Sequence, residues 1–186
     1  MKTTEYTIEV VKELEQTLSH ISADDAERLL KIIIASKKIL VAGAGRSGLA
    51  MKAFAMRLAH MGFKSYVVGE TITPHFEQGD LLLIGSGSGE TGSLVCMAEK
   101  AKKIGGSIAL ITILPESSIG RLADVTIKIP APTPKATGAE AWVSIQPMGS
   151  LFEQSLLIFL DSVILKLMEE MTNDSANMFK RHANLE

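Results

Sequence analysis

The fold is decided by two similar stretches, ILVAGAGRSG at residues 39–48 and LLLIGSGSGET at residues 81–91. In each stretch a run of apolar β-formers gives way to glycines and hydroxyls, which then open a helix. Glycine lets the backbone approach a ligand closely, and the first turn of a helix offers unpaired N–H groups at the positive end of its dipole. The sequence therefore predicts two anion-binding loops at the carboxyl edge of one parallel sheet, where they can grip one phosphate together.

Strands and helices alternate around these two loops. We expect strands at 38–42, 65–69, 80–85, 107–112 and 124–129, and helices at 47–61, 91–104, 118–122 and 150–170. Apolar residues at helical spacing predict two further helices before the first strand, the second starting at Ser22. This order indicates an α/β protein with a doubly wound parallel sheet flanked by helices, of the flavodoxin-like three-layer type.

Two segments do not fit the alternation. Residues 130–149 are rich in proline and glycine, so we expect a long functional loop there. Residues 173–186 are polar, and their simplest interpretation is a frayed tail. A single domain over 1–186 is predicted, with N-terminal helices at 1–36, an α/β core at 37–171 and a tail at 172–186.

Composition limits the classes of function. The chain has 186 residues and a formal net charge of −2, which suits one domain and gives no electrostatic reason to expect nucleic acid as a partner. Its one cysteine, Cys96, cannot form an internal disulfide, and the most apolar stretch, 156–168, is too short to cross a bilayer. We therefore expect a cytoplasmic protein that does not interact with membranes.

Other phosphate-binding folds are alternatives. Gly43, Gly45 and Gly48 satisfy the G-x-G-x-x-G pattern, and Glu70 lies where a dinucleotide-binding fold puts its ribose acid. A dehydrogenase, however, normally needs a further domain for its substrate, and a dinucleotide site does not call for the second, hydroxyl-rich loop. Neither loop has the Gly-Lys-Ser/Thr ending of a nucleoside triphosphatase.

The chain resembles the sugar isomerase (SIS) domain family over nearly its whole length. The resemblance is carried by GRS at 45–47 and SGSGET at 86–91, each after a strand, in a chain that opens with two helices. Within the family, GAGRSG at 43–48, PMGSLFE at 147–153 and the ending RHANLE at 181–186 are similar to the 6-phospho-3-hexuloisomerases. These enzymes interconvert D-arabino-3-hexulose 6-phosphate and D-fructose 6-phosphate in formaldehyde fixation by the ribulose monophosphate route.

The resemblance implies a binding site for the phosphate. Ser47 is expected to contact the sugar or its phosphate. Arg46 is a candidate to neutralise the phosphate or polarise the ketone, although it can equally pair with a surface acid. The second loop is implied to hold the phosphate through Ser86, Gly87, Ser88, Gly89 and Thr91.

The resemblance also implies the catalytic residues. Moving a ketone between C3 and C2 through a cis-enediol needs one base, and Glu153 matches the glutamate that serves as the base in hexuloisomerases. The pattern Ser150-Leu151-Phe152-Glu153 is also a capping box, in which the glutamate only caps its helix. His182 is implied as a second catalytic group, from its own or a neighbouring subunit, at the end of a tail that reaches an active site. No metal or cofactor is expected, because no His/Cys cluster has ligand spacing.

Other polar residues are weaker candidates. His20 and His60 are interpreted as surface or packing groups. His75, in a loop that we expect near the carboxyl edge of the sheet, is a candidate for substrate contact. Glu90 is interpreted as structural, because a carboxylate is favourable at a helix start. Cys96 is expected in the core.

The last predicted helix, apolar around much of its circumference, favours a subunit interface. The resemblance implies a homotetramer, with association with 3-hexulose-6-phosphate synthase as a further possibility. Two alternatives stay open: a phosphosugar-sensing module and another SIS isomerase, such as an arabinose 5-phosphate isomerase. Against a sensor, the residues before the first strand are too few and too acidic for a DNA-binding domain.

Overall fold

The computed structural model describes residues 1–132 and 143–185. Its sheet has the strand order β2-β1-β3-β4-β5, and every pairing is parallel. The strands are β1 (Ile39–Gly43), β2 (Ser65–Val67), β3 (Leu81–Gly85), β4 (Ser107–Thr112) and β5 (Val125–Lys128). This order confirms the predicted doubly wound sheet, in which the chain first moves outward from β1 to β2 and then crosses back to β3.

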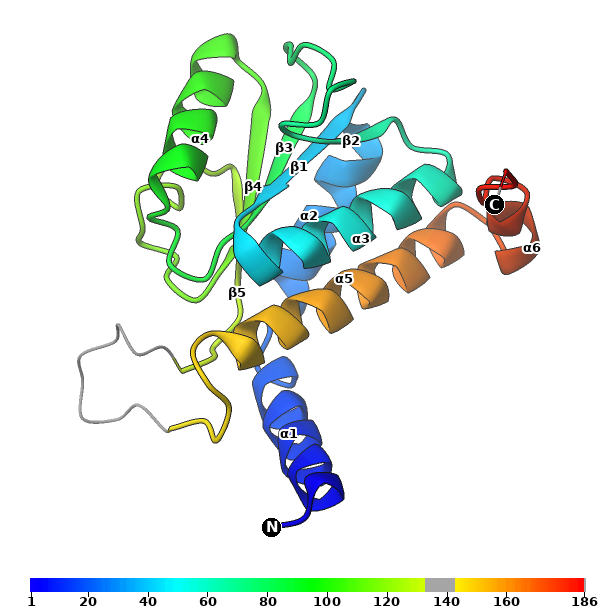
Figure 1. Ribbon diagram of the computed structural model, residues 1–186. Coiled ribbons are helices and arrows are strands. Elements are labelled where there is room, and N and C mark those ends of the chain that lie inside the picture. Colours follow the sequence, from blue (N-terminus) through cyan, green and yellow to red (C-terminus); the bar gives the residue numbers. More distant parts are fainter. Residues whose placement is uncertain (133–142, 186) are drawn as a thin grey trace.

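Helices cover both faces of the sheet (Figure 1). The helices are α1 (Thr3–Leu18), α2 (Ala23–Ala35), α3 (Gly45–Met61), α4 (Gly92–Ile104), α5 (Ser150–Glu170) and α6 (Ser175–Phe179). Helices α2, α3 and α5 pack on one face, and α4 packs on the other. Helix α1 packs against α5 and extends away from the sheet (Figure 1).

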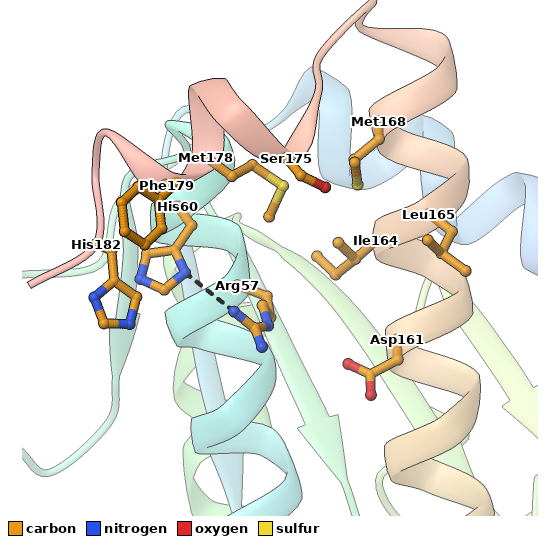
Figure 2. A pocket seen from close by; sticks show the side chains of 10 residues that line it. All are labelled: Arg57, His60, Asp161, Ile164, Leu165, Met168, Ser175, Met178, Phe179 and His182. Atoms are coloured by element: carbon orange, nitrogen blue, oxygen red, sulfur yellow. Dashed lines mark hydrogen bonds between the residues drawn. The ribbon is translucent and has the colours of Figure 1, made fainter.

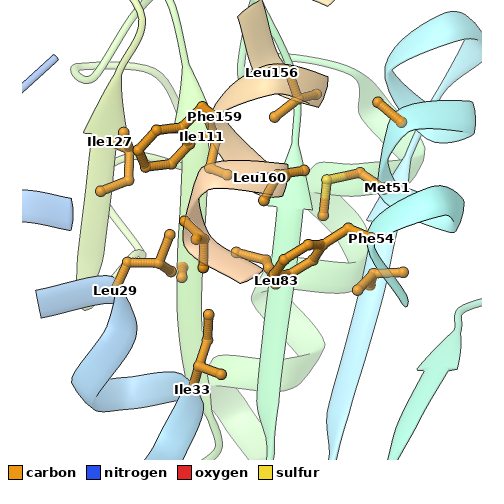
Figure 3. Close-up of a cluster of buried hydrophobic side chains, with 14 of the residues drawn as sticks. Leu29, Ile33, Met51, Phe54, Leu83, Ile111, Ile127, Leu156, Phe159 and Leu160 are labelled. Atoms are coloured by element: carbon orange, nitrogen blue, oxygen red, sulfur yellow. The ribbon is translucent and has the colours of Figure 1, made fainter. Parts of the chain in front are cut away.

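Alternate residues of each strand enter two separate cores, because successive side chains of a strand point to opposite faces. Leu83 and Ile111 face α2, α3 and α5, and Figure 3 shows them packed against Phe54, Leu156 and Leu160. Their neighbours in the strands face α4 instead. The central strands are therefore apolar on both faces, as the continuous apolar runs in the sequence predict.

Three glycines bring the start of α3 close to the sheet. A Cβ on Gly48 would lie 2.7 Å from the carbonyl oxygen of Gly43, and one on Gly43 would lie 2.9 Å from the Cα of Gly48. A Cβ on Gly85 would lie 2.7 Å from the sulfur of Met51. Any larger residue would push the helix outward, so these glycines set the distance between α3 and the strands that carry both loops.

The predicted helix at 118–122 is wrong, because these residues form successive turns. The Ser117 hydroxyl accepts a hydrogen bond from the backbone N–H of Gly120 at 3.3 Å, and so replaces the partner that a helix would provide. The backbone N–H of Leu122 bonds to the Ile119 carbonyl three residues earlier. A polar side chain that competes for backbone groups thus keeps the segment as turns.

Part of the predicted loop at 130–149 lies outside the described residues, namely 133–142. The remainder, 143–149, leads into α5. Within the described ranges, none of the helices combines the length and the apolarity that a bilayer crossing requires.

Candidate functional site

The two glycine-rich loops lie side by side. Strands β1 and β3 are adjacent and in register, with Gly43 opposite Gly85 at their carboxyl ends. The chain leaves the sheet at these two glycines, so the loops beginning at Ala44 and Ser86 start from neighbouring points on one edge. This is the arrangement that the sequence predicts for a shared anion site.

The second loop is braced by its own hydroxyls. Ser86 is buried, and its Oγ accepts a hydrogen bond from the N–H of Gly89 at 3.1 Å. The Oγ of Ser88 accepts from the N–H of Glu90 at 3.2 Å. Gly89 has a φ of +60°, a conformation that favours glycine. Each serine accepts a backbone bond here and keeps its own O–H to donate to a ligand.

Strand β4 holds the same loop from the other side. The Thr112 Oγ1 donates to the carbonyl of Gly87 at 3.1 Å and accepts from the N–H of Leu114 at 3.1 Å. The N–H of Ile113 also donates to the Gly87 carbonyl, at 3.1 Å. The loop is therefore fixed before any ligand arrives, which lowers the entropic cost of binding.

Thr91 is the N-cap residue of α4, and its side chain makes no capping hydrogen bond. Its hydroxyl therefore remains available beside the first N–H groups of the helix. Those groups and the helix dipole favour an anion at this end.

Glu90 joins the loop to the turns that follow β4. Its Oε1 accepts a hydrogen bond from the N–H of Ser118 at 2.6 Å. Hydrogen bonds from Ser118, with Arg121 nearby, hold the pKa of Glu90 below its ordinary value. Glu90 thus has a structural contact, made through a turn rather than through the helix dipole alone.

The first turns of α3 and α5 meet through an ion pair. The Nε of Arg46 donates a hydrogen bond to the Oε2 of Glu153. The Arg46 side chain is 63% exposed and the Glu153 side chain 20% exposed, so the carboxylate is the more enclosed partner. A cavity of about 270 Å³ adjoins the pair and is lined also by Leu49, Gln154 and Leu157.

The capping-box interpretation of Glu153 is wrong. Helix α5 begins at Ser150, its N-cap is Gly149, and no side chain caps it. Ser150 is thus already inside the helix and cannot serve as the cap, and the Glu153 carboxylate pairs with Arg46 instead of returning to its own backbone.

Phe152 joins the start of α5 to the second loop. It is buried, and a Cβ on Gly87 would lie 3.3 Å from its ring. Phe152 and Thr112 are two residues of the site that are not predicted from the sequence. The only sequence signal for Thr112 is its position at the end of a strand, and for Phe152 its place next to Glu153. The contact of Phe152 with Gly87 therefore places the start of α5, and with it Glu153, next to the loop at 86–91.

His182 lies at the opposite end of α3 within the same chain. Its ring centroid is 5.3 Å from that of His60 and 5.9 Å from that of Phe179 (Figure 2). Because α3 rises about 1.5 Å per residue, His60 lies roughly 20 Å along the helix from Arg46. His182 and Glu153 are therefore not brought together within one chain.

The tail that carries His182 is docked rather than frayed, which corrects the simplest interpretation of 173–186. Asp174 caps α6 by accepting from the N–H of Asn177 at 2.7 Å. Arg181 donates to the His60 carbonyl at 3.3 Å, and Asn173 donates to that of Met61 at 3.4 Å. These contacts fix the tail at the C-terminal end of α3.

The other histidines lie away from the loops. His75 is expected near the carboxyl edge, and this is wrong: Lys38, just before β1, donates to the His75 carbonyl at 3.1 Å, so His75 lies at the amino edge. His20 bonds to the Gln16 carbonyl at the end of α1, at 2.7 Å.

The prediction that Cys96 lies in the core is also wrong, because its side chain is exposed. The buried face of α4 runs through Leu94, Ala98 and Ala101. Cys96 is two residues from both Leu94 and Ala98, which puts it on the other side of the helix.

Known proteins are similar to this chain over the segments that form the candidate site. The SIS domain family matches residues 32–158. The chain is 55% identical to a 3-hexulose-6-phosphate isomerase from Bacillus subtilis over 186 residues, 100% of both chains. It is 43% identical over 159 residues to the 3-hexulose-6-phosphate isomerase of Methanocaldococcus jannaschii, covering 86% of this chain and 83% of that one.

A solved structure gives the same result for the fold. It is a Methanococcus jannaschii protein for which a molecular function of 3-hexulose-6-phosphate isomerase was inferred. The two structures superpose with a TM-score of 0.84 at 38% identity, over 98% of this chain and 99% of that one. The similarity covers both glycine loops and the helix that carries Glu153.

Proposed function

Because this chain belongs to the SIS domain family, we propose that it holds a phosphosugar at residues 86–91 and isomerises it beside Arg46 and Glu153. The reaction is the interconversion of D-arabino-3-hexulose 6-phosphate and D-fructose 6-phosphate, the activity that names its full-length relative at 55% identity. It serves formaldehyde fixation by the ribulose monophosphate route. The observation that carries the residue assignment is the ion pair of Arg46 and Glu153 beside a braced, hydroxyl-rich loop.

The phosphate is bound by the second loop. Ser86, Ser88 and Thr91 donate their hydroxyl hydrogens, and the glycines Gly87 and Gly89 allow the backbone to come close. The first turn of α4 adds its dipole. Ser47, in the first turn of α3, contacts the sugar or the phosphate from the neighbouring loop.

Glu153 moves the proton between carbons. It removes the hydrogen at C2 of the 3-ketose, the electron pair forms the C2–C3 double bond of a cis-enediol, and a proton returns at C3 as the C2 ketone forms. One base on one face of the sugar suffices for both transfers. The position of the Glu153 carboxylate, 20% exposed and paired with Arg46 at the start of α5, supports this role.

Arg46 stabilises the negative charge that develops on oxygen. Its guanidinium bonds to Glu153 through Nε, which leaves the N–H groups of its two terminal nitrogens to donate to the substrate. The ion pair with Glu153 orients the guanidinium in advance, so less reorganisation is needed as the charge develops.

His182, the second catalytic group, acts in the site of a neighbouring copy of the chain. Within its own chain it lies beside His60, which is roughly 20 Å along α3 from Arg46. Several large apolar side chains on α3 and α5 are exposed and support assembly, among them Leu49, Met56, Leu157, Ile158 and Leu165. The family resemblance suggests a homotetramer, and association with 3-hexulose-6-phosphate synthase is a further part of the proposal. The proposal involves no cofactor and no metal, and it puts the protein in the cytoplasm.

Turnover of three phosphosugars tests this function. We expect the purified protein to convert 3-hexulose 6-phosphate to fructose 6-phosphate and to leave arabinose 5-phosphate unchanged. Turnover of arabinose 5-phosphate instead would identify another SIS isomerase. Binding of a phosphosugar without turnover of any would identify a sensing module.

A further inference from the structure

The carboxylate of Glu13, on α1, holds the segment that leads into the catalytic helix. Its Oε2 accepts hydrogen bonds from the Ser144 hydroxyl at 2.7 Å and from the Gln146 side-chain amide at 2.9 Å. Its Oε1 accepts from the N–H of Ile145 at 2.8 Å. Three consecutive residues, more than 130 positions along the chain, thus converge on one carboxylate.

This segment is continuous with the start of α5. The N–H of Gln146 bonds to the Ser144 hydroxyl at 3.0 Å, and the N–H of Ser150 bonds to the Pro147 carbonyl at 3.2 Å. The N–H of Glu153 bonds to the carbonyl of Gly149, the N-cap residue, at 3.0 Å. These hydrogen bonds and the short stretch of backbone between them therefore connect Glu13 with the backbone of Glu153.

The turn at 147–149, between residues 144–146 and α5, contains a strained backbone conformation that contacts from elsewhere must stabilise. Met148 has a φ of +56°, in the left-handed region that a residue with a side chain adopts only at a cost. Such a conformation persists when its surroundings fix it. The contacts on the Glu13 carboxylate fix the segment just before Met148.

Helix α1, which carries Glu13, packs against α5. Leu14 and Leu18 pack on the core, and Thr17 is buried. Burial raises the pKa of Glu13, but hydrogen bonds from Gln146, Ser144 and Ile145 outweigh it and lower that pKa below the ordinary value. The group is therefore a carboxylate at neutral pH, and bonds to a charged acceptor are about twice as strong as neutral ones.

We propose that Glu13 is a positioning residue for the isomerase: by holding residues 144–146 it fixes the turn at 147–149 and so the place of the Glu153 carboxylate. The proposal rests on the role of Glu153 given above. Glu13 makes no hydrogen bond to the loop at 86–91, whose bracing bonds come from Ser86, Ser88 and Thr112. Its loss therefore affects the proton transfer and spares phosphate binding.

Glu13→Ala tests the proposal, with Glu15→Ala as the matched control on an exposed position of the same helix. Alanine is a good helix former, so α1 is retained in both. We expect kcat to fall about tenfold in Glu13→Ala with KM changed less than about twofold, because small misplacements of a catalytic group cost this much or more. Glu13→Gln keeps one acceptor oxygen and recovers part of the rate. If kcat in Glu13→Ala is unchanged and equals that of the Glu15→Ala control, the proposal is overturned.

A double-mutant cycle separates positioning from a loss of stability. Gln146→Ala removes one of the same bonds from the segment and leaves α1 untouched. If Glu13 acts through the segment, the two substitutions together lower kcat by less than the product of their single effects. If the effects of the two substitutions on kcat multiply independently, the proposal is contradicted. It is also contradicted if the variants lower the melting temperature and leave kcat unchanged. If Glu153→Gln leaves turnover intact, the proposed role of Glu153 fails; if Glu153→Gln is inactive and only the Glu13 variants are unaffected, this inference fails alone.

Discussion

Arg46 and Glu153 form an ion pair although 107 positions separate them in the chain. Each lies in the first turn of its helix, and the two helices start at the same edge of the sheet. The pair places a fixed cation and a partly enclosed carboxylate beside the loop at 86–91. In the proposed mechanism Glu153 is the base and Arg46 the oxyanion stabiliser, the two groups that an enediol mechanism requires.

Replacing Arg46 should impair the chemical step. We expect Arg46→Gln to lower kcat about 100-fold, the usual cost of losing a donor to a developing oxyanion. Arg46→Lys keeps the charge but not the planar fork of donors, so it should recover only part of the rate. The measurement is steady-state kinetics with 3-hexulose 6-phosphate. A normal kcat in Arg46→Gln would assign Arg46 to a surface ion pair.

Replacing Thr91 should impair binding instead. Thr91→Val keeps the shape and removes the hydroxyl that makes no capping bond. A hydrogen bond to a charged group contributes about 1.5–3 kcal/mol, so KM should rise at least about tenfold while kcat changes little. The melting temperature should stay the same, because the hydroxyl has no structural bond to lose. A lowered melting temperature with unchanged KM would instead make Thr91 structural.

The stability of the protein should fall as the pH falls below about 6.5, the ordinary pKa of histidine. Burial, then Arg57 and His182, lower the pKa of His60 in the folded chain. The unfolded chain therefore takes up a proton at a higher pH than the folded chain does, and stability is lost between the two pKa values. Thermal melts of wild type from pH 7 to pH 5 should show this loss.

His60→Leu should flatten that dependence, since leucine fills the site without titrating. His20→Gln, at an exposed position, is the control and should keep the slope of the wild type. Equal slopes in His60→Leu and wild type would mean that another group sets the pH dependence.

Much of the fold and part of the site could be predicted from local patterns. The apolar runs ending in Gly43 and Gly85 specify adjacent strands, and the predicted doubly wound parallel sheet and the family membership are confirmed. Local patterns work here because the glycine loops and the strands before them are contiguous in sequence. The pairing of their carboxyl ends then follows from the topology of a parallel sheet.

Contacts between distant segments could not be predicted in the same way. The capping box at Ser150 is a valid local pattern, but the pairing of Glu153 with Arg46 overrides it. His75 follows a strand in sequence, yet its loop returns to the amino edge before β3 begins. The contact of Glu13 with residues 144–146 joins two segments that share no sequence pattern.

The most direct test of the central claim is proton NMR of fructose 6-phosphate in D2O, with wild type and with Glu153→Gln. Wild type should exchange the hydrogen on C3, because the reverse reaction removes it to form the enediol. Glu153→Gln should bind the sugar phosphate and exchange nothing. Exchange at C1, or C3 exchange that continues at the wild-type rate in Glu153→Gln, would contradict an isomerase in which Glu153 is the base.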